Sequence, residues 1–158
     1  MHEDRTQRLD GTDRRLLGLL QGDAQLTAQD LGAALNLSPS QAGRRRQRLE
    51  GLGLVAGYTA RLSAARLGLS VQAFVQVEMA SHDPGLIASF SALVAHSREI
   101  TSAWTLTGAA DHLLRVYCTD LAAFNHLLHK VLLPHPAVAR VQSQIVMDQF
   151  KDDAPLPI

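Results

Sequence analysis

Hydrophobic residues recur every three or four positions over the first third of the chain and alternate with polar residues in several later segments. The early spacing is that of amphipathic helices, and turn signals divide it into three pieces. Thr12 or Asp13 can cap the first, Thr27 the second, and Ser38 followed by Pro39 begins the third. The pattern predicts three short helices around one small core.

The second and third of these helices have the arrangement of a helix-turn-helix. They are separated by a turn at residues 36–39, where Asn36 suits a left-handed helix end. Four arginines, at positions 44, 45, 46 and 48, follow on the third helix. The plain alternative is a helical hairpin with a solvated basic face, but the turn chemistry and the clustered guanidinium groups favour a helix that enters the DNA major groove.

Candidate DNA contacts lie near the start and on the polar faces of the third helix. Side chains near its N-terminal end would reach base edges, and later arginines would more often meet phosphate. The candidates are Ser38, Ser40, Gln41, Arg44, Arg45 and Arg48.

The chain after the third helix changes character twice. Residues 54–62 show a short alternating pattern interrupted by Gly57, which predicts a small β-ribbon, the wing of a winged helix. Residues 63–70 are small and mixed and are interpreted as a linker.

From Val71 onward the periodicity predicts a second, α+β domain. Strands are expected to start at Val71 and to cover residues 100–106, 112–119 and 138–150. One helix opens at Asp83-Pro84, and another is capped by Asp120. The order β-α-β-β-α-β is the ferredoxin-like arrangement.

The predicted fold class is therefore α+β with two domains. A winged helix-turn-helix domain covers residues 1–62, and a ferredoxin-like domain covers residues 71–151. Residues 152–158 contain two prolines and are expected to be disordered.

Composition and charge narrow the function. Of the 158 residues, 46% are hydrophobic and 19% are charged, as in a folded protein. No apolar run is long enough to cross a bilayer. The single cysteine fits a reducing cytoplasm. The net charge is zero, yet residues 1–66 hold ten arginines and seven acidic residues (+3), and residues 67–158 hold five basic and eight acidic residues (−3). The basic excess lies in the helical half, as expected for DNA binding.

Enzymatic chemistry has little support in the sequence. His126 and His129 have metal-pair spacing but no acidic or cysteine partner completes a ligand set. Asp111 and His112 are neighbours that would point to opposite faces of a strand. We expect no catalytic residue, metal or cofactor.

Two sets of motifs resemble the Lrp/AsnC (feast/famine) family of transcription regulators. They are Leu9-Asp10-x-x-Asp13, Leu37-Ser38-Pro39-Ser40, Arg45, Arg48-Leu49-Glu50 and Gly53-Leu54-Val55-x-Gly57-Tyr58 in the first half, and Thr107-Gly108-x-x-Asp111-x-Leu113-Leu114 and Pro136-x-Val138 in the second. The resemblance covers about residues 9–151.

The resemblance implies a DNA-binding head joined to a sensing domain. Such proteins bind double-stranded DNA, dimerise through the sensing domain and often assemble into octamers, and their effectors are usually amino acids bound near the turn at residues 108–111. The candidate effector residues are Thr101, Thr107, Gly108, Ala109, Ala110, Asp111 and Ser143. The turn itself has two open interpretations: a plain hairpin turn, or exposed amides that hold an α-carboxylate, with Asp111 orienting the turn or meeting an α-ammonium.

Two departures from the family pattern stand out. Arg46 occupies a position that is commonly aliphatic, so we expect its stem over the edge of the core and its guanidinium in solvent or on phosphate. Ala109 and Ala110 replace residues that are often acidic and aromatic.

The predicted function is an effector-responsive, DNA-binding transcription regulator. The alternative is a small-molecule-sensing assembly protein that acts through a protein partner.

Overall fold

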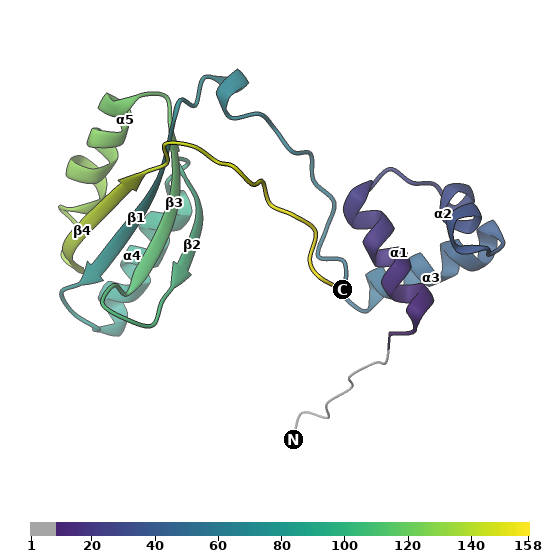
Figure 1. Ribbon diagram of the computed structural model, residues 1–158. Coiled ribbons are helices and arrows are strands. Elements are labelled where there is room, and N and C mark those ends of the chain that lie inside the picture. The colour runs from purple at the N-terminus through teal and green to yellow at the C-terminus, as the bar shows by residue number, and fades with distance from the viewer. Residues whose placement is uncertain (1–8) are drawn as a thin grey trace. The chain divides into compact units, whose positions relative to one another are not determined.

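The computed structural model describes residues 9–158, which form two compact units (Figure 1). One unit comprises the chain up to Ala60 together with Lys151–Ile158, and the other comprises Arg61–Phe150. Within residues 9–158, no helix has the length and apolar character needed to cross a membrane.

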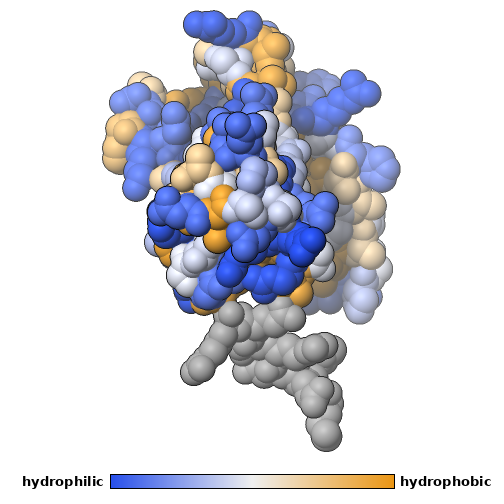
Figure 2. Space-filling view, turned by 90° about the vertical axis from the view of Figure 1, so that its right-hand side faces the viewer, coloured by the Kyte–Doolittle hydropathy of each residue, from blue (hydrophilic) through white to orange (hydrophobic). Residues whose placement is uncertain are grey.

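The first unit contains the three predicted helices: α1 (Gly11–Gly22), α2 (Ala28–Leu35) and α3 (Pro39–Gly51). Their buried apolar residues meet in one cluster, formed by Leu16, Leu17, Leu20, Leu31, Leu35, Ala42 and Leu49. Figure 2, which turns this unit toward the viewer, shows a largely hydrophilic face. The amphipathic spacing therefore predicted the core of this unit correctly.

Each helix of the first unit begins with a capping box. The predicted caps Thr27 and Ser38 are confirmed. The predicted cap of α1 is wrong, because Asp10 occupies that position: its side chain accepts a hydrogen bond from the Asp13 backbone, and the Asp13 side chain accepts one from the Asp10 backbone. Asp13 is thus the third helical residue.

The turn between α2 and α3 is tightly packed. Asn36 adopts the predicted left-handed conformation, with φ 55°. A Cβ on Gly32 would lie 2.8 Å from the Leu37 carbonyl oxygen, so the turn backbone comes as close to α2 as a glycine permits. The close approach holds α3 at a defined angle to α2.

The predicted β-ribbon is absent, because residues 54–62 form no strand in this chain. A ribbon requires two paired strands, and this stretch has no partner segment beside it within residues 9–158. Side chains attach the segment instead, since the Tyr58 hydroxyl donates to Glu50 Oε1 at 2.7 Å. The following residues, read as a linker, contain one short 3₁₀ helix, η1 (Ala65–Leu67).

The second unit has the predicted β-α-β-β-α-β order. Its elements are β1 (Val71–Met79), α4 (Pro84–His96), β2 (Ile100–Thr105), β3 (His112–Cys118), α5 (Leu121–His126), which continues as the π-helical turn η2 (Leu127–Leu132), and β4 (Val138–Ile145). All strand pairs are antiparallel, in the order β2-β3-β1-β4. The ferredoxin-like arrangement is confirmed.

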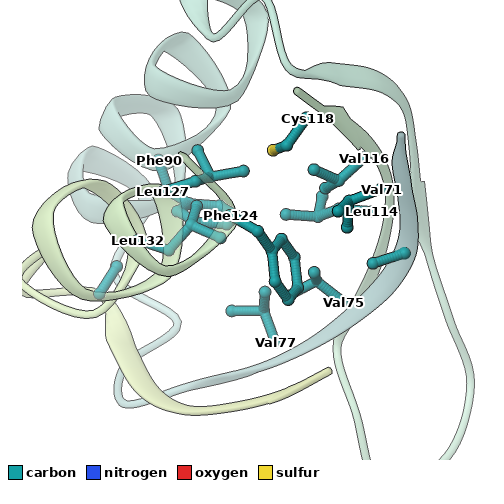
Figure 3. Close-up of a cluster of buried hydrophobic side chains, with 12 residues drawn as sticks. Val71, Val75, Val77, Phe90, Leu114, Val116, Cys118, Phe124, Leu127 and Leu132 are labelled. Atoms are coloured by element: carbon teal, nitrogen blue, oxygen red, sulfur yellow. The ribbon is translucent and has the colours of Figure 1, made fainter. Parts of the chain in front are cut away.

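One face of this sheet and both helices enclose the second core (Figure 3). Alternate residues of β1, such as Val75 and Val77, are fully buried, and Phe90 of α4 and Phe124 of α5 pack over them. The other face of the sheet carries the intervening residues, among them Phe74, which is half-buried.

The last strand is shorter than predicted. It ends at Ile145 and not at residue 150, because its partner β1 begins at Val71 and the Val146 amide makes the final backbone hydrogen bond to this strand, at the Gln72 carbonyl. Residues 152–158, for which the sequence predicts disorder, form no helix or strand, and within the first unit the Leu156 backbone exchanges two hydrogen bonds with the Gln21 side chain.

Candidate nucleic-acid interface and effector turn

The N-terminal end of α3 is ordered by its own polar residues. Gln41 Oε1 accepts hydrogen bonds from the Ser38 backbone and from Ser38 Oγ, both at 3.0 Å. Ser40 Oγ lies 3.2 Å from Ser38 Oγ. Three of the predicted DNA contacts therefore also shape the start of the helix.

The arginines of α3 differ sharply in their surroundings. Arg44 is exposed and makes no hydrogen bond or ion pair with other residues of the described chain, 9–158. Arg45 Nη1 donates to both Asp10 Oδ2 and Asp13 Oδ1 at 2.7 Å, and Arg48 Nη2 donates to Asp13 Oδ2 at 2.6 Å. We call these four residues, Asp10, Asp13, Arg45 and Arg48, the acid–arginine clamp.

Burial divides the clamp into an inner and an outer part. The Asp13 side chain is 2% exposed, whereas those of Arg45 and Asp10 are 32% and 51% exposed. The negative charge of a buried carboxylate must be balanced by nearby positive charge, which the guanidinium groups of Arg45 and Arg48 supply here. Asp13 is thus the fixed centre of the clamp and Asp10 its solvent-facing member.

The ionisation of the two carboxyl groups reflects these contacts. Burial acts to raise the pKa of Asp13, but hydrogen bonds from Arg48 and Arg45 outweigh it, so this pKa lies below its ordinary value. The pKa of Asp10 is also lowered, first by the Asp13 backbone amide and then by Arg45. The hydrogen bond to Asp10 in turn raises the pKa of Arg45. Both carboxylates are charged at neutral pH.

The clamp lies in the same surface depression as other candidate DNA contacts. The depression is lined by Asp10, Asp13, Leu37, Gln41, Arg44, Arg45 and Arg48. Four of the six predicted DNA contacts are therefore brought together, with two carboxylates between them. Ser38 and Ser40 lie at the helix start beside Gln41.

Arg46 was predicted to place its guanidinium group in solvent or on phosphate; its side chain is 25% exposed, but protein atoms hold the guanidinium group. Its Nε donates to Glu50 Oε1 at 2.9 Å and its Nη1 to the Leu26 carbonyl at 3.0 Å. The guanidinium carbon lies 5.0 Å from the centre of the Tyr58 ring. Because Glu50 and Tyr58 are also bonded to each other, Arg46 belongs to a structural contact between α3 and the segment that follows it.

The turn between β2 and β3 is anchored by Asp111. Its Oδ2 accepts from the Met79 amide at 2.7 Å, its own amide donates to the Val77 carbonyl, and its carbonyl accepts from the Leu106 amide. Gly108 has φ +127°, a conformation that favours glycine. Asp111 Oδ1 lies 3.9 Å from His82 Nε2. These contacts support Asp111 as the residue that orients the turn.

Of the other predicted effector residues, three belong to this turn and two lie on separate strands. Thr107, Ala109 and Ala110 belong to the turn, and Ala110 is buried. Thr101 lies on the edge strand β2, where its Oγ1 donates to the Arg115 carbonyl, and Ser143 lies on the opposite edge strand β4. In residues 9–158, no group of three or more His, Cys, Asp or Glu side chains could hold a metal.

Family models match both units of the chain. Residues 9–50 match the AsnC-type helix-turn-helix domain, and residues 72–156 match the Lrp/AsnC ligand binding domain. The chain belongs to the Lrp/AsnC family of transcription regulators.

Curated relatives of this Lrp/AsnC regulator align along almost the whole chain. The DNA-binding transcriptional activator DecR of Escherichia coli (strain K12) is 33% identical over 150 residues, 95% of this chain and 99% of its own length. The leucine-responsive regulatory protein of Salmonella typhimurium (strain LT2) is also 33% identical, over 95% of this chain and 92% of its own length.

Solved structures show the same fold. A transcriptional regulator of Neisseria meningitidis, determined as a complex with L-methionine, is 37% identical with a TM-score of 0.91, over 95% of this chain and 97% of that one. An AsnC family regulator from Agrobacterium tumefaciens is 30% identical with a TM-score of 0.87, over 94% and 97% of the two chains. The chain is a DNA-binding transcription regulator with a ligand-binding domain.

Sequence reasoning missed the acid–arginine clamp of this Lrp/AsnC regulator. The signal was present, since Arg45 and Arg48 are three residues apart on one face of α3, and Asp10 and Asp13 have the same spacing at the N-cap and the third position of α1. The packing of α1 against α3, which joins residues 32 to 35 positions apart, could not be read from either pair alone.

Proposed function

We propose that α3 binds double-stranded DNA in the major groove through its N-terminal half, with Arg44 as the main cationic contact. The observation that carries this proposal is the exposed, unpaired Arg44 on a capped helix that the turn at Asn36 holds against α2. Ser38, Ser40 and Gln41 at the start of the helix are the candidates nearest to base edges. Arg45 lies about one turn and Arg48 about two turns beyond Gln41, where phosphate contacts are expected.

The functional protein is proposed to be a homodimer that assembles further, up to an octamer. Support comes from the sheet face that the helices leave uncovered. It carries Phe74, Leu113 and Trp104, since residues paired across strands share a face, and Trp104 is 45% exposed. A two-fold pair of DNA-binding heads would match a pseudo-palindromic operator, and this activity on DNA belongs in the cytoplasm.

The effector is proposed to be an amino acid that binds at residues 107–111. Support comes from the L-methionine complex of the Neisseria regulator and from the chemistry of the turn. Because Asp111 already accepts from the Met79 amide, we assign it to holding the turn, and the turn amides to the α-carboxylate. Thr101 and Ser143 lie on opposite edges of one sheet, so a site that used both would need a neighbouring subunit. The protein acts by binding and not as an enzyme.

Fluorescence anisotropy with DNA from around its own gene tests this function. Affinity is expected to fall steeply between about 50 and 200 mM salt, as for complexes that release counterions. Adding single amino acids should change either this affinity or the mass of the protein measured by light scattering. The absence of binding at low ionic strength contradicts the DNA proposal, and the absence of both amino-acid effects contradicts the effector proposal.

A further inference from the structure

The acid–arginine clamp places one exposed carboxylate, Asp10, and one buried carboxylate, Asp13, beside the arginines where DNA phosphate is expected. Asp10 and Asp13 line the same depression as Arg44 and Gln41. A DNA backbone that entered this depression would therefore meet negative charge beside the positive charge of α3.

Carboxylate and phosphate compete for the same arginine geometry. A guanidinium group recognises the paired oxygens of either anion through charge-assisted hydrogen bonds. Arg45 Nη1 already contacts one oxygen of each of the two aspartates at 2.7 Å. An arginine compensated in this way adds little to the counterion release on which sequence-independent DNA affinity depends.

The outer member of the clamp is the one that DNA can displace. Asp13 is buried and also holds Arg48, so its contacts persist as long as α1 packs on α3. Asp10 is half-exposed and holds Arg45 from the solvent side. Its carboxylate is therefore the one with which a phosphate competes directly.

We propose that Asp10 acts as a built-in phosphate mimic that restrains Arg45 and so lowers the affinity of the protein for DNA of arbitrary sequence. This inference rests on the proposed binding of DNA by α3. Non-specific binding depends almost wholly on phosphate contacts, whereas base contacts from the start of α3 are unaffected by the restraint. Asp10 is thus a specificity-determining residue that never touches a base.

The substitution Asp10→Ser isolates this role. Serine is as good an N-cap as aspartate, so α1 keeps its cap while Arg45 loses its outer partner. Affinity for a labelled duplex of arbitrary sequence is expected to rise several-fold, and the slope of log affinity against log salt should steepen by up to about one.

Asp23→Ser is the matched control. It removes one negative charge from the same unit, at the opposite end of α1, where Asp23 accepts a hydrogen bond from the Gln25 backbone and lies outside the clamp. If both variants gain affinity equally, the effect is one of net charge and the proposal fails. A far-UV circular dichroism spectrum like that of the wild type and cooperative thermal unfolding show that Asp10→Ser retains the fold.

The double variant Asp10→Ser/Arg45→Ala completes the test. If the two charges cancel each other in the wild type, removing both should return the affinity and the salt slope to wild-type values. Retention of the gain by the double variant overturns the proposal, as does an unchanged slope for Asp10→Ser. If the wild type binds DNA but the variants show none of these changes in affinity or salt slope, the role of Asp10 is refuted and the proposed function stands. If neither the wild type nor any variant binds DNA, the proposed function is refuted as well.

Discussion

Truncating Asp13 is predicted to destabilise the helical unit far more than truncating Asp30. The two aspartates occupy equivalent positions, since each is the third residue of its helix and completes a capping box. Only Asp13 is buried and bonded to arginines. The comparison therefore separates the clamp from the cap.

The magnitude follows from the contacts that are lost. A hydrogen bond between charged groups contributes about 1.5–3 kcal/mol, and Asp13 accepts one from each of two arginines. The guanidinium groups are 32% and 46% exposed and regain water, so the lower limit applies to each bond. Asp13→Ala should thus cost about 3 kcal/mol, which lowers the melting temperature of a unit of this size by on the order of 10 °C or more.

Circular dichroism at 222 nm, combined with hydrogen exchange of α1 and α3 peptides, measures this effect. Exchange in α1 and α3 should accelerate in Asp13→Ala, and the sheet of the second unit should keep its protection. Asp30→Ala should give a clearly smaller shift in melting temperature. Equal shifts for the two variants would show that the arginine contacts add no stability and would refute the reasoning.

Two further predictions concern packing and pH. Gly32→Ala should lower the melting temperature of the first unit, because the added Cβ would lie 2.8 Å from the Leu37 carbonyl oxygen. Gly18→Ala is the control and should not lower it, because a Cβ there meets nothing within 4 Å. An unchanged melting temperature for Gly32→Ala would show that the turn can move. The carboxyl groups of Asp10 and Asp13 have lowered pKa values in the folded protein, so the stability that they add is present above the unfolded pKa near 3.9 and is lost as the pH falls through the folded values. Melting curves between pH 7 and pH 2 should show this loss in the wild type, with a flatter acid limb in Asp13→Ala; superimposable limbs would contradict it.

The sequence predicted the elements whose determinants are local. Thr27 and Ser38 were correctly predicted as caps, because the side-chain oxygen of an N-cap accepts a hydrogen bond from the backbone amide only three residues further along the chain. Asn36 was correct for the same reason. At the start of α1 the predicted caps, Thr12 and Asp13, were wrong, because Asp10 is an equally acceptable cap and local chemistry alone does not choose among the three.

Features that depend on distant segments could not be predicted. The end of β4 is set by where β1 begins, and the predicted ribbon at residues 54–62 lacks a partner strand. The contacts of Arg46 could not be predicted, because its guanidinium group donates to Glu50 and to the Leu26 carbonyl, which is 20 residues away. The division of the α3 arginines into paired and unpaired likewise follows from tertiary packing.

The central claim, that α3 binds DNA chiefly through Arg44, is tested most directly by the salt dependence of promoter binding. Arg44→Ala is compared with Arg14→Ala, which removes an exposed arginine from α1 of the same unit. The account predicts that Arg44→Ala weakens binding and reduces the slope of log affinity against log salt by about one, while Arg14→Ala leaves the slope nearly unchanged. Equal slopes for Arg44→Ala and the wild type would contradict it.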